Sequence, residues 1–97
     1  IGWRAMQLNE TGQFNVAVGS TAMVNNKGAS NNVAIGYGAM TGAASGMTSQ
    51  ASANIALGSG TLVNLVSGQR NFAAGFNALN KNTSASYNIA IGYESLY

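Results

Sequence analysis

Large apolar and small residues alternate in five short segments of the chain. Each segment begins with Asn and continues with a large apolar residue, Ala, a second apolar residue and Gly, as in Asn15 to Gly19. Alternating residues point to opposite sides of a strand, so the large side chains share one face and Ala and Gly share the other. The pattern predicts a short strand in each of the segments 15–19, 32–36, 54–58, 71–75 and 88–92.

The glycines that close these segments recur at a nearly constant spacing. With Gly2, which belongs to an incomplete sixth copy, their separations are 17, 17, 22, 17 and 17 residues. A constant period indicates one small unit that is copied and stacked. We therefore expect residues 1–97 to form a single repeat array, whose rungs are centred on Gly2, Gly19, Gly36, Gly58, Gly75 and Gly92.

A long, flexible apolar residue follows each glycine by four positions, which predicts a core stripe. These residues are Met6, Met23, Met40, Leu62, Leu79 and Leu96. In four of the five connections, eight residues rich in Asn, Ser, Thr and Gly then lead to the next Asn. This is turn chemistry, and eight residues suffice for a turn, a short extended return and a second turn. The prediction is an all-β fold, a β-solenoid or β-roll with two short strands per rung.

The remaining connection, residues 41–53, carries five extra residues without disturbing the period on either side. An insertion that leaves the period intact should bulge from the surface. We expect it to be a candidate contact loop, and a neutral insertion is the alternative. The residues assigned to this loop as contacts are Thr41, Gly46, Met47, Gln50 and Ala53.

The small-residue face is uniform from rung to rung, which is unnecessary on a surface exposed to solvent. Small residues imply that another backbone approaches closely. It could be the opposite wall of the same coil or an identical chain, and we expect the face to turn toward neighbouring chains. For the glycines alone, a positive φ is the alternative explanation. The face comprises Ala17, Gly19, Ala34, Gly36, Ala56, Gly58, Ala73, Gly75, Ala90 and Gly92.

An Asn opens every complete segment. Stacked in adjacent rungs about 4.8 Å apart, the Asn side chains could form a hydrogen-bonded ladder, or each could hold the turn that enters its strand. A ligand site built from Asn rungs is a third interpretation. The residues concerned are Asn15, Asn32, Asn54, Asn71 and Asn88.

Composition narrows the chemistry. The chain is 46% hydrophobic and 6% charged, which favours an ordered structure over solvated disorder. It has no Cys, no His and only two acidic residues, so we expect no catalytic site, no metal and no cofactor. A net charge of +2 from scattered cations does not predict a nucleic-acid partner, and no apolar run is long enough to predict membrane insertion.

Segments 32–40 and 88–96 resemble the N-[VIT]-A-I-G-Y-x-A-L repeats of bacteriophage tail-fibre and related surface proteins. The V-A-I-G core is also similar to the head repeats of trimeric autotransporter adhesins, which form a left-handed parallel β-roll in a homotrimer. The adhesin repeat is usually shorter and has Ser before V-A-I-G, so the tail-fibre repeats are the better match. Nothing in the chain resembles the self-cleaving chaperone domain with which such fibres often end.

The resemblance implies a homotrimer and a structural or adhesive function. We expect the chain to be a window of a longer fibre, forming a shaft or head segment of a virion tail fibre that mediates host attachment. Its partners would be copies of itself and a cell-surface receptor, with glycans as one receptor class. A bacterial cell-surface adhesin is the first alternative, and a self-assembling, amyloid-like extracellular filament is the second.

Overall fold

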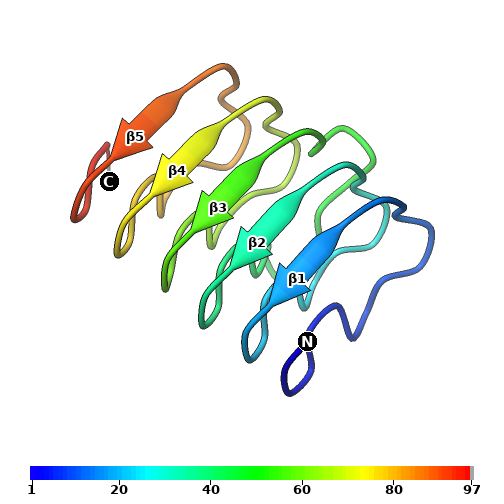
Figure 1. Cartoon of the computed structure of the whole chain (residues 1–97). Coiled ribbons are helices and arrows are strands. Elements are labelled where there is room, and N and C mark those ends of the chain that lie inside the picture. The colour runs from blue at the N-terminus through cyan, green and yellow to red at the C-terminus, as the bar shows by residue number, and fades with distance from the viewer. Residues whose placement is uncertain (97) are drawn as a thin grey trace.

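The computed structural model describes residues 1–96 of the chain; Tyr97, the last residue of the predicted array, lies outside the described residues. The fold is an all-β parallel solenoid, with extents of 30 × 24 × 21 Å. Its strands lie side by side in chain order and point the same way (Figure 1). They are β1 (Val16–Val18), β2 (Val33–Ile35), β3 (Ile55–Leu57), β4 (Phe72–Ala74) and β5 (Ile89–Ile91).

The strands pair with equivalent positions opposite one another. Ala17 pairs with Ala34, Ala34 with Ala56, and the same alignment continues to β5. The pairing of β2 with β3 keeps this register, although 22 residues separate equivalent positions there. The predicted repeat and the prediction that the insertion leaves the period intact are both confirmed.

Five of the six rungs contain one strand each and the incomplete rung around Gly2 contains none, so the prediction of two strands per rung is wrong. The strand covers three residues and ends where the glycine adopts a positive φ, such as +133° at Gly36. The second and fourth residues after that glycine also have a positive φ in every rung, for example 58° at Thr21 and 52° at Met23. These left-handed residues coil the connection into successive turns instead of an extended return.

The turns stack as regularly as the strands do. The backbone N–H of Met23 donates to the carbonyl of Ala39 over 3.0 Å, and that of Leu62 donates to Ala78 over 3.2 Å. Such bonds join each turn to the turn of the next rung. Backbone pairing between rungs therefore continues beyond the strands and supports the non-glycine residues in their left-handed conformations.

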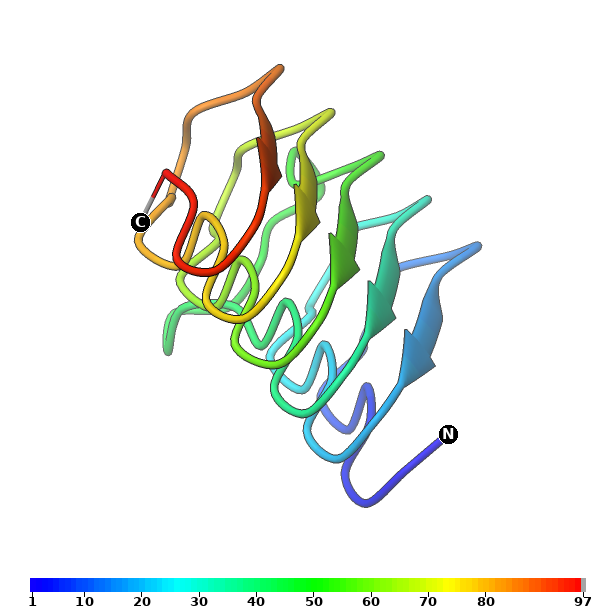
Figure 2. The same ribbon diagram turned by 60° about the vertical axis from the view of Figure 1, so that its left-hand side comes forward.

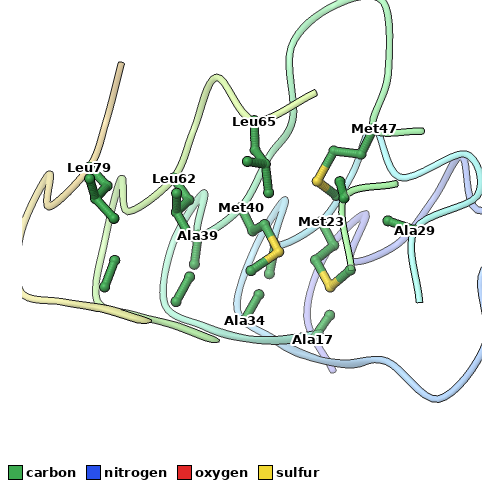
Figure 3. Close-up of a cluster of buried hydrophobic side chains, with 14 of the residues drawn as sticks. Ala17, Met23, Ala29, Ala34, Ala39, Met40, Met47, Leu62, Leu65 and Leu79 are labelled. Atoms are coloured by element: carbon green, nitrogen blue, oxygen red, sulfur yellow. The ribbon is translucent and has the colours of Figure 1, made fainter. Parts of the chain in front are cut away.

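The core lies inside the coil, between the strands and the turns that follow them. Met23, Met40 and Leu62 are fully buried, and their side chains point toward the strand alanines (Figure 3). The predicted core stripe is confirmed for these rungs. Only the end rungs differ, since Met6 is half-buried and Leu96 is exposed.

Candidate interaction surface

The strand alanines form the inner wall of the coil. Ala34, Ala56 and Ala73 are fully buried within the single chain, and Ala17 and Ala90 are nearly so. The expectation that this small-residue face turns toward neighbouring chains is therefore wrong. The side chains that pack against the alanines belong to the opposite wall of the same coil, where the Met and Leu stripe fills the narrow interior.

The glycine line brings consecutive rungs together. A Cβ atom on Gly36 would lie 2.7 Å from the carbonyl carbon of Gly58 and 2.8 Å from its oxygen. A Cβ atom on Gly19 would lie 2.5 Å from the oxygen of Gly36. The close approach is thus between rungs of one chain. A positive φ, the alternative explanation for the glycines, also holds, because their φ values are +121° to +133°.

The Asn column forms a buried ladder that also fixes the corner before each strand. The Oδ1 atom of Asn15 accepts a 2.9 Å hydrogen bond from the backbone N–H of Asn32. Its Nδ2 group donates over 2.8 Å to the carbonyl of Ala29, three residues before Asn32. The same pair of bonds links Asn32, Asn54 and Asn71 to the rungs that follow them. Asn71 and Asn88 also donate to the Oδ1 atom of the Asn one rung before, over 3.1 and 3.2 Å, as the ladder interpretation requires. The turn interpretation differs from the structure, because each Asn side chain holds the corner of the following rung and not the turn that enters its own strand.

A second recurrent Asn position, ten residues before the glycine, was not predicted from the sequence. Asn26 is fully buried, and its side chain bonds both the N–H and the carbonyl of Ala29, at 2.8 and 3.1 Å. Asn82 makes the same two bonds to Ala85, at 3.0 and 3.1 Å. The signal was an Asn ten residues before the glycine in three of the five complete copies, including Asn9. Among residues 1–96, every fully buried side-chain nitrogen and oxygen has a hydrogen-bond partner.

The insertion is only partly a surface loop. Met47 is fully buried and forms a parallel bridge with Asn26, and Ala51 is also fully buried. Met47 therefore cannot serve as the predicted contact residue, because its side chain fills the core beside Leu65 (Figure 3). Gly46 is covered as well, since the aliphatic stem of Lys27 lies against it.

One exposed part of the insertion is a tight turn, which the buried residues Gly46 and Met47 separate from a second exposed stretch at residues 48–50. Its tip is Ala44 and Ser45, closed by a 2.7 Å hydrogen bond from the N–H of Gly46 to the carbonyl of Ala43. Of the predicted contact residues, Gln50 and Ala53 are exposed and Thr41 is half-buried. The loop lies away from the strands, on the far side of the coil (Figure 2).

The opposite face of the strands is apolar and open. We call it the outer face, and it consists of the first and third residues of each strand. Ile35 is 42% exposed and Ile91 is 69% exposed, while no outer-face residue is fully buried. The large strand residues therefore point outward, away from the core. The residues are Val16, Val18, Val33, Ile35, Ile55, Leu57, Phe72, Ala74, Ile89 and Ile91.

A row of aromatic side chains runs along one border of the outer face. Trp3, Tyr37, Phe76 and Tyr93 directly follow the glycines and are exposed. The rings of Phe76 and Tyr93 stack with their centroids 5.5 Å apart. Ser20 and Ser59 take the equivalent position in the other two rungs, so the row is interrupted there.

The described part of the chain has no pocket, and it holds no group of three or more His, Cys, Asp or Glu residues placed to bind a metal ion. None of its segments is a helix long and apolar enough to cross a membrane. No protein-family model, curated protein or solved structure matches the chain.

Proposed function

We propose that this chain is a rigid structural segment of a homotrimeric surface fibre that mediates attachment to a host cell. The observation that carries the proposal is the unbroken register from β1 to β5, which survives the 22-residue step. A stack in which every rung bonds to the next transmits force along its axis and resists bending. It suits a shaft or head that holds a binding surface away from a particle.

The resemblance of segments 32–40 and 88–96 to tail-fibre repeats supports a virion tail fibre as the setting. Within that function, the exposed turn at Ala44 and Ser45, with Gln50 nearby in sequence, is the proposed receptor contact. In a homotrimer it would be present three times. Weak contacts of a single loop, for example with a surface glycan, would then be strengthened by avidity.

The oligomeric state is tested by light scattering on the purified chain. The proposal requires a particle of three times the 9.8 kDa chain mass. A stable, folded monomer would overturn the homotrimer. Open-ended growth that existing fibres seed would instead favour a self-assembling filament.

Attachment is tested by binding fluorescently labelled protein to a panel of bacterial strains, with purified surface polysaccharide as competitor. The matched variants are Gln50→Ala in the insertion and Gln7→Ala, an equally exposed residue outside it. We expect Gln50→Ala to weaken binding and Gln7→Ala to leave it unchanged. Failure to bind any strain would contradict the attachment function.

A further inference from the structure

We infer that the outer face is the surface through which copies of this chain pack against one another. The inference rests on the proposed function only in naming further copies as the occupant. It assigns the contact to the large-residue face of the sheet, which is the side opposite to the one the sequence pattern suggested.

The chemistry of the face does not suit permanent contact with water. Strand residues such as Ile35, Ile89 and Ile91 are 42%, 72% and 69% exposed in the single chain. On a solvated face of a strand, polar residues with good strand propensity, such as Thr, would serve equally well. Instead, all ten positions of the outer face are apolar. A continuous apolar patch of this kind marks an interaction site.

The periodicity of the face identifies a second copy as the occupant. Two outward side chains recur in every rung, and equivalent residues lie directly opposite one another in the pairing. A partner without this repeat can match one or two rungs at a time. A second copy that runs in the same direction presents identical rows at identical spacing, so every rung meets an equivalent rung.

The distribution of charge also favours a second copy as the occupant of the outer face. None of the ten outer-face positions is charged. The aromatic row is bordered by one charge at its N-terminal end, where the Arg4 guanidinium lies 5.1 Å from the centroid of the Trp3 ring. Two copies can therefore approach face to face without burying a charge from either strand. An acidic or basic receptor would find no complementary group on this face.

The insertion also leaves the outer face undisturbed. Its extra residues leave β2 and β3 paired in register and emerge on the far side of the coil (Figure 2). The outer face thus keeps its register at the one place where the repeat is interrupted. The exposed tip at Ala44 and Ser45 would remain accessible after copies had assembled.

Because the outer face is small, association between copies should depend on the number of rungs in the array. Five rungs at about 4.8 Å and strands of about 10 Å span a projected area of roughly 240 Å². A standard interface buries about 800 Å² of accessible surface per partner, so the outer face of this chain is smaller than a stable interface usually is. Because every further rung adds two outward side chains, binding should strengthen steeply as rungs are added.

The test measures mass by sedimentation equilibrium and secondary structure by circular dichroism. The variant is Ile35→Glu, which places a charge on the outer face, and the control is Ser45→Glu at the exposed tip of the insertion. We expect Ile35→Glu to remain folded but to raise the concentration of half-dissociation at least about tenfold. Ser45→Glu should assemble like the unchanged chain.

A second pair of proteins keeps the test decisive if Ile35→Glu fails to fold. Ile35→Thr preserves the β-branched shape and should weaken assembly less than Glu does. An array lengthened by one copy of the unit 76–92 should dissociate at a concentration at least about tenfold lower than the original. A monomer at both lengths, or association that ignores both length and Ile35→Thr, would overturn the inference.

The outcomes separate this inference from the proposed function. A dimer that Ile35→Glu dissociates would support the outer face and contradict the homotrimer. A trimer that persists unchanged with Ile35→Glu would support the homotrimer and contradict the outer face as its interface. Attachment to cells by a monomeric chain would leave the attachment function standing and contradict this inference.

Discussion

The side chain of Asn32 and the backbone of Asn54 meet through a 2.8 Å hydrogen bond, although they lie 22 residues apart instead of 17. Asn32 also donates to the carbonyl of Ala51 over 2.8 Å. These are the two bonds that a ladder Asn makes in the regular rungs. The extra residues are therefore absorbed before Ala51, and the corner that leads into β3 is restored by the time the chain reaches the strand.

The first prediction concerns this ladder. Asn32→Ala removes the partners of a backbone N–H at Asn54 and of a carbonyl at Ala51, at a site where Asn32 and Asn54 are fully buried. We expect the free energy of unfolding to fall by about 1–3 kcal/mol, the cost of leaving such groups unsatisfied. Chemical denaturation measures it. The exposed Gln50→Ala is the control, and equal losses in both variants would contradict a structural ladder.

The second prediction separates the two reasons for glycine. Gly36 and Gly92 have φ values of +133° and +123°, but only a Cβ on Gly36 would meet another rung. Gly92→Ala should cost the backbone strain alone, about 1–3 kcal/mol. Gly36→Ala should cost that strain plus about 1–3 kcal/mol of overpacking against Gly58. Thermal unfolding compares the two, and identical destabilisation would show that close approach between rungs contributes nothing.

The third prediction concerns the inner wall. Ala34 and Ala56 are fully buried in the narrow interior, so Ala34→Leu or Ala56→Leu forces a larger side chain against the Met and Leu stripe. We expect a loss of at least about 1–3 kcal/mol in the stability of each chain, visible as a lower melting temperature at every concentration. Weaker assembly with an unchanged fold would instead place these alanines between chains.

The fourth prediction concerns the insertion. Met47 is fully buried, so Met47→Ala leaves a cavity in the core and should destabilise the chain by about 2–5 kcal/mol. Ala44→Ser, at the exposed tip of the same loop, should change stability by less than about 0.5 kcal/mol. Urea denaturation distinguishes them. A harmless Met47→Ala would mean that the whole insertion is a surface loop.

The repeat, its register and the buried stripe could be predicted from the sequence because each depends on residues that recur at one spacing. The direction of the two strand faces could not. Alternation separates Val33 and Ile35 from Ala34, but it does not say which side lies inside. In a coil this narrow, the fully buried Met and Leu side chains of the facing wall occupy most of the interior. The inward-facing position of each strand then has room only for a residue as small as Ala.

Two local features also lay beyond the sequence pattern. Neither Thr21 nor Met23 is a residue type that favours a positive φ by itself. Their left-handed conformations depend on backbone bonds to neighbouring rungs, from the N–H of Thr21 to the carbonyl of Trp3 in the preceding rung and from that of Met23 to Ala39 in the following rung. Met47 occurs once and has no equivalent in the other rungs, so no period could mark it as a core residue. Both are set by the stacking of rungs and not by local preference.

The central claim is that the inner wall builds each chain and the outer face joins chains. Isotope-filtered nuclear Overhauser spectroscopy, on an assembly mixed from ¹³C-labelled and unlabelled chains, tests it without any mutation. The account expects contacts between chains from the methyl groups of Ile35 and Leu57 and none from those of Met40 and Leu62. Interchain contacts at Met40 and Leu62, or their absence at Ile35 and Leu57, would contradict it.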